Sequence, residues 1–513
     1  MANKKTGIVY LVGGGPGHPD LITVRGRKIL ESSDVVIYDY LVHAALLDIA
    51  AHAQEKIYIG RKGLASKRPN QAAINQLMIR LARTGKTVVR LKGGDPFIFG
   101  RGGEEALALK KANIRYEIVP GVTAAFGAAA YAGIPLTHRE LSSDITFVTA
   151  HEDPAKQSSY LNWETIAKLK GTLIIYMGTR ALGKIAKLLI HFGKEKSTPV
   201  AVIRWATTGN QQTVTGTLAT IEQEVKRAKI TAPTVILVGK VVSLRKSLKW
   251  FEEKPLFGKT ILVTRARTQA SSLSHELQNL GARVVEFPTI EIKEAEDFTK
   301  LDLALHHIEN YDWLIFTSEN GVSAFMRRVC LMNMDARDLH SIQIAAVGSG
   351  TEKKLGEYAL KADLIPTTFS TEGLFRELKK QGQVAGKRFL LLRTDIAPKK
   401  LAQSLVKEGG LVSEISVYRT EKPKFSGEKL VRLLKHEKID CVTFTSSSTA
   451  ENFLGALSTS ERKQIRAKLV SIGPVTSGTI REFGVKPNAE ANPHNIPALV
   501  EAVEACFKNG KKH

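Results

Sequence analysis

The sequence is poor in cysteine and has no long apolar runs, and each shortage argues against a class of protein. Three cysteines in 513 residues, far apart and without a CxxC pair, argue against a disulfide scaffold or a zinc framework and indicate a reducing cytoplasm. No stretch approaches the roughly 18 uninterrupted apolar residues of a membrane span, and the N-terminus lacks the apolar core of a signal peptide. We therefore expect a cytoplasmic protein with no membrane partner and no metal.

Acidic residues are scarce relative to basic ones. The formal net charge is +24, and residues 1–250 contain 36 Lys and Arg against 18 Asp and Glu. This excess favours a partner rich in carboxylates or phosphates, and the alternative is a basic, solvated surface without a partner. The sequence has no arginine-rich tail, RNP motif or zinc-finger spacing, so we expect no nucleic-acid partner. A small molecule with several carboxylates is the better candidate.

Short β-branched runs alternate with amphipathic stretches along both halves, which is typical of an α/β fold. A chain of 513 residues is too long for one core. The charged segment Ser243–Gly258 contains Pro255 and precedes a new strand, so we place the main domain boundary there. In the first half a helix is expected over Gln71–Arg83, and strands are expected over 8–12, 34–39, 87–91, 145–150, 171–178, 199–206 and 233–239.

The second half contains an internal repeat, which predicts two similar α/β lobes. Three pairs of segments match: 261–292 with 389–420 and 311–321 with 439–449, both at an offset of 128, and 345–351 with 470–476 at an offset of 125. The repeat also pairs polar residues at strand ends, Ser318 with Ser446 and Thr351 with Thr476. We expect these four residues to face each other across a cleft, and the alternative is that they only cap helices.

Glycine is concentrated in two loops that follow apolar strands of the first half. GGGPGHPD (Gly13–Asp20) follows the first strand, and RLKGGDPFIFGRGG (Arg90–Gly103) continues the strand at 87–91. Glycine lets the main chain approach a ligand closely, and open α/β sheets bind ligands at the carboxyl ends of their strands. The first loop lacks the GxGxxG register, so it is a weak signal for NAD. Together the loops predict a small, partly polar cofactor held largely by main chain.

Three ordered segments, 9–42, 90–107 and 119–140, give the first half a resemblance to the tetrapyrrole methylases, and within that family to the uroporphyrinogen-III C-methyltransferases. The likeness covers about residues 7–250 and includes the YMG motif at 176–178. It implies transfer of methyl groups from S-adenosylmethionine to two pyrrole carbons of uroporphyrinogen III, which gives precorrin-2. It also implies a cofactor cleft between two α/β lobes and a homodimer formed through this half.

The resemblance implies roles for individual residues of the first half. Asp39 matches the proton acceptor, with a helix N-cap as the alternative, and Arg139 is a candidate carboxylate clamp. Arg61 stands where the family often has a proton-donating lysine; arginine is a poor donor, so Arg61 would pair with a substrate carboxylate unless Lys62 supplies the proton. His18 replaces a common aspartate. The cofactor-binding candidates are Pro16, Gly93, Gly94, Asp95, Ile98, Thr123, Ala124, Met177 and Ala206, with core filling as the alternative for Met177.

The second half resembles the uroporphyrinogen-III synthases over about residues 259–513, through VTRARTQASSLSHELQNLGARVVEFPTIEI, YDWLIFTSENGV, AAVGSGT, VYRT, TFTSSST and SIGPVTSGT. This family implies two flavodoxin-like lobes joined by two strands, here Phe287–Ile292 and Ile415–Thr420. It implies closure of linear hydroxymethylbilane with loss of water and inversion of the last ring. Tyr418 would assist loss of the hydroxyl group, or would only pack between the lobes. Substrate carboxylates would bind Ser318, Thr351, Ser446 and Thr476.

The two resemblances support each other, because the product of the second half would be the substrate of the first. The expected organisation is a methylase at 1–245, a linker at 246–258 and a synthase at 259–513, with synthase lobes at 259–287 plus 419–513 and at 293–414. The rival hypotheses are a methylase of another corrinoid precursor or of a protein, a synthase half that is an inactive docking module, and a basic nucleic-acid-binding protein.

Overall fold

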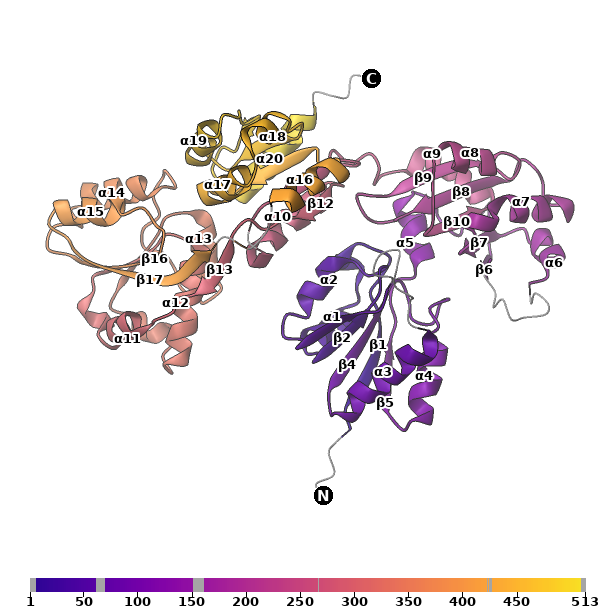
Figure 1. Cartoon of the computed structure of the whole chain (residues 1–513), viewed down its shortest axis with the longest axis horizontal. Helices are drawn as coiled ribbons and strands as arrows, with labels where there is room; N and C mark the ends of the chain where they lie inside the picture. The colour runs from indigo at the N-terminus through magenta and orange to yellow at the C-terminus, as the bar shows by residue number, and fades with distance from the viewer. Residues whose placement is uncertain are drawn as a thin grey trace. The chain divides into compact units, whose positions relative to one another are not determined.

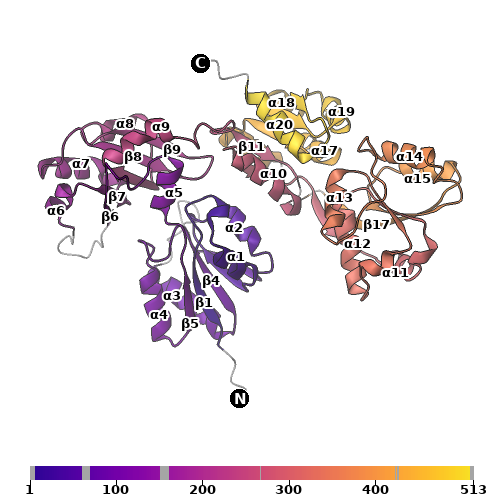
Figure 2. The ribbon, with the colours of Figure 1, turned by 180° about the vertical axis from the view of Figure 1, so that it is seen from behind.

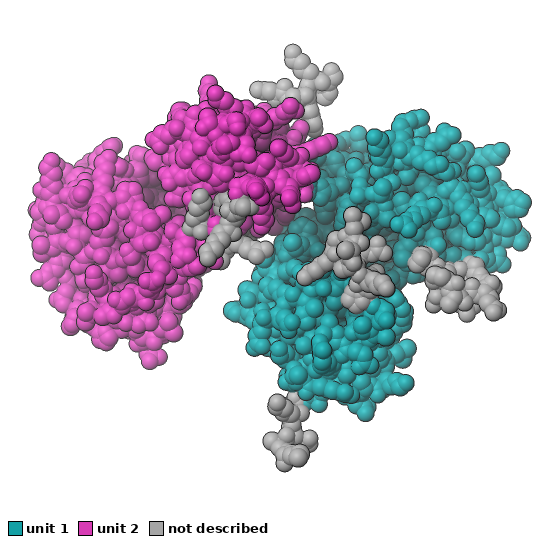
Figure 3. Space-filling view, in the orientation of Figure 1, with its two compact units in different colours: residues 1–258, 280–283 teal, residues 259–279, 284–513 magenta. Residues whose placement is uncertain are grey.

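The computed structural model describes residues 6–60, 70–150, 161–265, 267–421, 423 and 427–508. The chain forms two compact α/β units, shown in separate colours in Figure 3. Unit 1 comprises Met1–Gly258 with Leu280–Arg283, and unit 2 comprises Lys259–Asn279 with Val284–His513. Among the described residues, no helix is both long enough and apolar enough to cross a membrane.

The first lobe of unit 1 is a parallel sheet with helices on both faces (Figure 1). Its elements are β1 (Ile8–Gly13), α1 (Val24–Glu31), β2 (Val35–Tyr38), α2 (Ala44–Ile49), β3 (Glu55–Tyr58), α3 (Gln71–Arg83), β4 (Thr87–Lys92), α4 (Gly102–Lys111) and β5 (Arg115–Val119). The strand order is β3–β2–β4–β1–β5. Side chains alternate along each strand, so Val9 and Leu11 pack under α3 and α4 while Val12 packs under α1 and α2. Because all the strands are parallel, their carboxyl ends lie at the same edge of the sheet.

The second lobe of unit 1 is a mixed sheet in the order β6–β7–β10–β8–β9. Its elements are α5 (Ala124–Tyr131), β6 (Ile145–Thr149), α6 (Trp163–Lys168), β7 (Thr172–Tyr176), α7 (Leu182–His191), β8 (Pro199–Arg204), β9 (Gln212–Thr217), α8 (Ile221–Arg227), β10 (Thr234–Val238) and α9 (Arg245–Leu248). Helix α5 packs on one face through Ala125, Ala128 and Ala129, and α6, α7 and α8 cover the other face. The predicted helix and all seven predicted strands are present.

The segment 246–258 is part of unit 1, whereas the sequence led us to expect a linker there. Phe251 and Leu256 are buried, and the rings of Trp250 and Phe251 pack against Tyr131 at 5.0 and 4.8 Å. Glu252 accepts hydrogen bonds from Gln211 and Thr213. The charges and the proline of this segment suggest a linker, but Phe251 and Leu256 anchor it in the core, and Trp250 packs on Tyr131 while it stays 45% exposed.

The first lobe of unit 2 contains a sheet in the order β12–β11–β18–β19–β20. Its elements are β11 (Thr260–Val263), α10 (Arg267–Asn279), β12 (Arg283–Glu286), α16 (Gly427–His436), β18 (Cys441–Phe444), α17 (Ser447–Gly455), α18 (Thr459–Lys463), β19 (Lys468–Ser471), α19 (Pro474–Glu482), β20 (Ala489–Glu490) and α20 (Ile496–Lys508). The pairs β11–β18, β18–β19 and β19–β20 are parallel.

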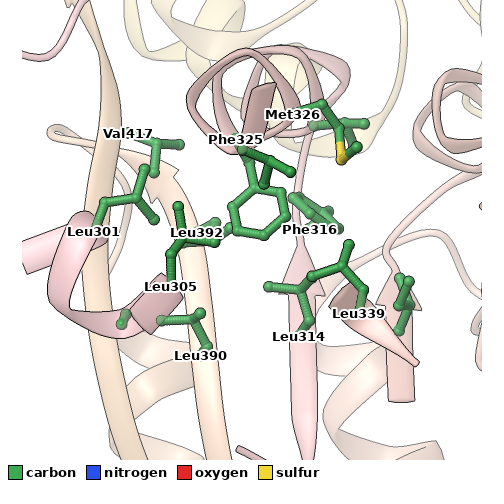
Figure 4. Packing of buried hydrophobic residues seen from close by; sticks show 14 of the residues in the cluster. Leu301, Leu305, Leu314, Phe316, Phe325, Met326, Leu339, Leu390, Leu392 and Val417 are labelled. Atoms are coloured by element: carbon green, nitrogen blue, oxygen red, sulfur yellow. The ribbon is translucent and has the colours of Figure 1, made fainter. Parts of the chain in front are cut away.

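The second lobe of unit 2 contains a sheet in the order β13–β17–β16–β14–β15. Its elements are β13 (Glu291–Glu294), α11 (Thr299–His306), β14 (Trp313–Phe316), α12 (Glu319–Leu331), β15 (Gln343–Ala346), α13 (Ser349–Gly356), α14 (Thr371–Lys380), β16 (Arg388–Thr394), α15 (Lys400–Lys407) and β17 (Leu411–Glu421). Helices α11 and α12 cover one face, where Phe316 and Phe325 lie in the core of Figure 4. Helices α14 and α15 cover the other face, and Figure 2 shows them across the sheet from α11.

The two lobes of unit 2 have the same local topology, as the internal repeat predicts. Strands β12, β11, β18 and β19 of one lobe correspond in order and in sequence offset to β17, β16, β14 and β15 of the other. The expected joining strand at 287–292 is wrong in its bounds, because β13 begins at Glu291 and the residues before it form no strand. The expected strand at 415–420 lies inside β17, which stays in the sheet of the second lobe to Glu421.

Candidate functional site

Glycines of three loops bring three strand ends of unit 1 into main-chain contact. The N–H of Gly94 donates to the carbonyl of Gly15 at 2.7 Å, and the N–H of Gly15 donates back at 3.2 Å. A Cβ atom on Gly121 would lie 2.4 Å from the carbonyl oxygen of Gly94 and 2.8 Å from the Cα of Gly13. Only glycine permits this approach, and Gly94 also has a φ of +69°. The loops after β1, β4 and β5 therefore meet at the carboxyl edge of the sheet.

Asp95 connects two of these loops. Its Oδ1 accepts from the N–H of Phe97 at 2.8 Å, and its Oδ2 accepts from the N–H of Gly121 at 3.0 Å. The adjacent Gly93 is half-buried, and Ile98 is exposed on the same loop. Asp95 thus has a structural role in holding the loop, in addition to any ligand contact.

The start of α5 contacts the end of β7. Thr123 precedes the helix, and its hydroxyl lies 2.7 Å from the hydroxyl of Tyr176, which also accepts from the N–H of Ala125 at 2.9 Å. Burial raises the pKa of the Tyr176 phenol. The next residue, Met177, is 48% exposed, so it does not fill the core. Sequence reasoning missed Tyr176, although it belongs to the YMG motif that was quoted.

The loop after β1 reaches the second lobe. A Cβ on Gly127 of α5 would lie 2.4 Å from Pro16, and one on Gly17 would lie 2.8 Å from the carbonyl oxygen of Ala206. The N–H of His18 donates to the hydroxyl of buried Thr207 at 2.8 Å. His18 also caps the short 3₁₀ helix Pro19–Leu21, which gives the unusual histidine a local role.

Strained backbone marks the same region. In this region five residues other than glycine have positive φ values: Phe99 at 52°, Arg101 at 59°, Met177 at 55°, Trp205 at 47° and Thr207 at 68°. Each costs of order 1–3 kcal/mol and persists only where the surrounding structure imposes it. The rings of Phe99 and Tyr176 lie 5.1 Å apart, so the loop that carries Ile98 reaches the Tyr176–Met177 segment. The contacts therefore link all the predicted cofactor residues into one region.

Asp39 lies at the carboxyl end of β2 in a buried cluster of charges. Its Oδ2 is 3.2 Å from the guanidinium of Arg90, and its Oδ1 accepts from the N–H of Leu41 at 3.1 Å. Arg90 also pairs with Glu105 at 3.3 Å, and Lys92 pairs with Glu105 at 3.0 Å. Burial is the main reason that the pKa of Lys92 is lowered, with repulsion from Arg90 next. Helix α2 is capped by His43, so Asp39 is not its N-cap.

The sequence did not reveal Arg90, Lys92 and Glu105 as members of this site. The available signal was two basic residues in an otherwise apolar central strand, which require buried acidic partners. Arg139 is exposed between α5 and β6 and is not among the residues that these contacts bring together. The predicted Arg61 and its neighbour Lys62 lie outside the described residues.

Tyr418 borders a cleft of about 330 Å³ in unit 2. Its hydroxyl lies 3.0 Å from that of Ser318, and burial raises the pKa of the phenol while Ser318 opposes the shift. The cleft combines Ser272 of α10 with side chains of the second lobe, so it lies between the lobes of unit 2. Its charged lining is Lys293, Glu294, Glu319, Arg327 and Lys354.

The repeat-related polar residues are divided between two roles. Ser318 and Ser446 are the N-caps of α12 and α17, as the alternative stated, and Ser318 also contacts Tyr418. Thr351 and Thr476 are buried third residues of α13 and α19, whose N-caps are glycines. None of the four predicted residues is among those that line the cleft, although Ser318 contacts Tyr418, which does. Sequence reasoning missed the basic residues Lys293, Arg327 and Lys354, which no motif distinguishes from surface lysines and arginines.

No group of three His, Cys, Asp or Glu side chains is placed to hold a metal ion in the part of the chain that the structure describes.

The comparisons with known proteins divide the chain in the same way. Residues 8–222 match the family model of tetrapyrrole (corrin/porphyrin) methylases, and residues 271–501 match that of uroporphyrinogen-III synthase HemD. A porphyrin biosynthesis protein HemD from Ruminiclostridium josui is 35% identical over 481 residues, which are 94% of this chain and 94% of that protein.

Two further relatives match the first half. An S-adenosyl-L-methionine-dependent uroporphyrinogen III methyltransferase from Methanosarcina barkeri is 49% identical over 242 residues, 47% of this chain and 94% of that protein. The crystal structure of a uroporphyrin-III C-methyl transferase from Thermus thermophilus with S-adenyl homocysteine is 35% identical and covers 46% of this chain and 100% of that one, with a TM-score of 0.40. The chain thus belongs to the tetrapyrrole methylase family through its first half and to the uroporphyrinogen-III synthase family through its second.

Proposed function

We propose that the chain catalyses two consecutive reactions of tetrapyrrole synthesis. Unit 2 closes hydroxymethylbilane to uroporphyrinogen III with loss of water, and unit 1 transfers two methyl groups to that product to give precorrin-2, a precursor of sirohaem and cobalamin. The observation that carries this proposal is the presence of both family matches, at 8–222 and 271–501, in one chain.

The region around Gly94 and Thr123 fits S-adenosylmethionine. The close main-chain contact of Gly13, Gly94 and Gly121 fixes the loops, Gly93 beside it is half-buried, and exposed Ile98 and Met177 offer apolar surface nearby. We assign cofactor contacts to Pro16, Gly93, Gly94, Asp95, Ile98, Thr123, Ala124, Met177 and Ala206. When bound, the cofactor supplies an electrophilic methyl group to a pyrrole carbon that is already nucleophilic, so the protein contributes mainly alignment.

Asp39 is proposed to accept the proton that leaves the methylated ring. Its carboxylate is held by Arg90 and the N–H of Leu41, and each oxygen retains a lone pair for a proton. Arg139 is proposed to bind a substrate carboxylate, and the role of Arg61 stays a prediction.

In unit 2 the substrate carboxylates are proposed to bind at the cleft beside Tyr418. Lys293 pairs with Glu421 at 2.6 Å, Lys354 pairs with Glu357 at 2.7 Å, and Arg327 pairs with Glu294. These side chains are partly exposed, so such pairs are weak and substrate carboxylates can replace the acidic partners. The raised pKa keeps the Tyr418 phenol protonated at neutral pH, so it can donate to the departing hydroxyl. Ser318 contacts Tyr418; roles for Thr351, Ser446 and Thr476 remain predictions.

A pair of substitutions tests this assignment in the full chain. Asp39→Asn removes the base and is expected to slow methylation by about 10²–10⁴-fold while uroporphyrinogen III still forms. Tyr418→Phe is expected to slow the formation of uroporphyrinogen III from hydroxymethylbilane, while methylation of added uroporphyrinogen III continues. Tyr311→Phe is the matched control, because the Tyr311 hydroxyl donates to Ser413 in the same lobe and does not line the cleft. Wild-type rates for either substituted half would reject that residue's role.

We further propose that two chains associate through unit 1 in the cytoplasm. The methylase resemblance and large exposed apolar side chains of unit 1, among them Val24 and Leu107, support the association. The free thiols of Cys330, Cys441 and Cys506 support the compartment. Light scattering should give twice the chain mass of 56.2 kDa. A single-chain mass at all working concentrations would contradict the dimer.

A further inference from the structure

Helix α5 is held at its C-terminal end by side chains from outside the helix. Trp250 Nε1 donates to the carbonyl of Ala130 at 2.9 Å, and Gln211 Nε2 donates to that of Tyr131 at 3.1 Å. Arg245 donates to the carbonyl of Ala132. The last carbonyls of a helix lack partners within it, and an eight-residue helix is marginal on its own. These donors therefore fix the helix whose first residues are assigned to the methyl donor.

Gln211 connects this end of α5 to the glycine loop after β1. Its Nε2 also donates to Glu252 at 3.0 Å, and its Oε1 accepts from the N–H of Thr207 at 3.0 Å. The hydroxyl of Thr207 accepts from the N–H of His18 at 2.8 Å. Hydrogen bonds thus run without interruption from Glu252 through Gln211 and Thr207 to the loop that contains Pro16. Thr207 directly follows Ala206, another assigned cofactor contact.

Glu252 organises the outer end of this network. One carboxylate oxygen accepts from both Gln211 and Thr213, and the other pairs with Arg245. Gln211 and Thr207 are 4% and 0% exposed, so water cannot substitute for a lost partner without rearrangement. Leaving a buried polar group unsatisfied costs about 1–3 kcal/mol. The neighbouring Glu253 differs, since it is exposed and pairs with Lys249 at 3.5 Å on the surface.

We propose that Gln211 and Glu252 are positioning residues for the methyl donor: they hold α5 and the Thr207–His18 contact in the geometry that binds it. The segment 246–258 thus contributes Trp250 and Glu252 to the support of the donor site. The inference rests on the proposed assignment of that site to S-adenosylmethionine. It adds residues that touch neither cofactor nor substrate.

The test measures binding of S-adenosylhomocysteine to the full chain by calorimetry. Gln211→Leu keeps most of the side-chain volume and removes the link, and Glu252→Gln keeps the shape and removes the charge. We expect the Kd to rise about tenfold or more for Gln211→Leu, less for Glu252→Gln, and not at all for the control Glu253→Gln. In steady-state assays the KM for S-adenosylmethionine should rise while kcat at saturation and uroporphyrinogen III formation stay within about twofold of wild type.

Other outcomes separate this inference from the function on which it rests. If wild type shows no binding of S-adenosylhomocysteine, the donor site itself is wrong. If wild type binds and folded Gln211→Leu and Glu252→Gln bind with the same Kd, the positioning role is wrong. A fall in kcat with unchanged KM would also overturn it. If Gln211→Leu does not fold, Trp250→Phe decides, because it removes one donor to α5 and retains an aromatic ring: a wild-type Kd then contradicts the proposal, and a raised Kd supports it.

Discussion

At the scale of single residues, the cluster around Glu105 shows how a parallel sheet accommodates charge. Glu105 is fully buried and pairs with both Arg90 and Lys92, and Gln71 donates to it at 3.1 Å. Two cations and the carboxylates of Asp39 and Glu105 balance, so no net charge is buried. This pairing explains why a central strand tolerates two basic residues, and one of the two carboxylates is the proposed base Asp39.

Substitution of Glu105 by glutamine should therefore be costly. It leaves two buried cations opposite one carboxylate, and breaking such a pair typically costs about 3–5 kcal/mol. The adjacent Glu104 is exposed and pairs with Arg101, so Glu104→Gln should change stability by less than about 1 kcal/mol. Differential scanning calorimetry of the full chain compares the two variants. Equal unfolding temperatures would show that the cluster does not stabilise unit 1.

His43 gives unit 1 a dependence of stability on pH. Burial lowers its pKa, repulsion from His18 lowers it further, and Asp48 opposes the shift. The unfolded chain therefore binds a proton more readily, and stability should fall as pH decreases from about 6.5 toward the lowered folded pKa. His43→Asn keeps an N-cap for α2 and removes the titrating group. The variant should therefore lose less stability than wild type over this pH window. Urea unfolding at several pH values measures the difference, and parallel pH profiles would contradict it.

Residues of the donor site could be predicted where the backbone itself demands a residue type. Gly94 was expected from the glycine-rich loop after the strand at 87–91, and its positive φ and close contacts require glycine, whereas Gly121 was not singled out. Tyr176 and Gln211 were missed, because a buried hydrogen-bonding partner is defined by its distant contacts and not by local sequence. Thr351 and Thr476 were correctly paired by the repeat, but sequence does not indicate whether such residues line a cleft or lie beneath it.

At the scale of elements, the loops after β1, β4 and β5 can contact one another only because each has a glycine at the point of contact. Gly121→Ala would place a Cβ against the carbonyl of Gly94 and the Cα of Gly13, neither of which can move alone. We expect the loops to separate and the Kd for S-adenosylhomocysteine to rise at least about tenfold. Gly103→Ala is the control: no atom lies within 4 Å of its Cβ position, and alanine favours helix α4. Calorimetry on both variants decides, and wild-type affinity for Gly121→Ala would contradict the site.

The strands that sequence reasoning did not find in unit 1 share a physical cause. β3, β5 and β9 are all edge strands, and they include exposed polar residues such as Glu55, Arg115 and Gln212. Central strands are covered on both faces and are mostly apolar, whereas these three edge strands carry exposed polar residues and lack that signal. The segment 246–258 was expected to be a linker because it is charged. Its contacts with unit 1 come from Trp250 and Phe251, which the charge pattern does not reveal.

At the scale of the whole molecule, two enzyme families share one chain, and their reactions join through a common compound. Uroporphyrinogen III is the product proposed for unit 2 and the substrate proposed for unit 1. Both substrates carry many carboxylates, which gives a chemical reason for the net charge of +24. The internal repeat and the order of the motifs made this organisation predictable, because a shared offset across several motifs reports a duplicated fold.

The most direct test of the account incubates the purified full chain with hydroxymethylbilane, with and without S-adenosylmethionine, and identifies the products by chromatography and mass spectrometry. We predict uroporphyrinogen III without the methyl donor and a dimethylated product, precorrin-2, with it. Formation of the type I isomer alone would contradict the role of unit 2. Type III isomer that stays unmethylated in the presence of the donor would contradict the role of unit 1.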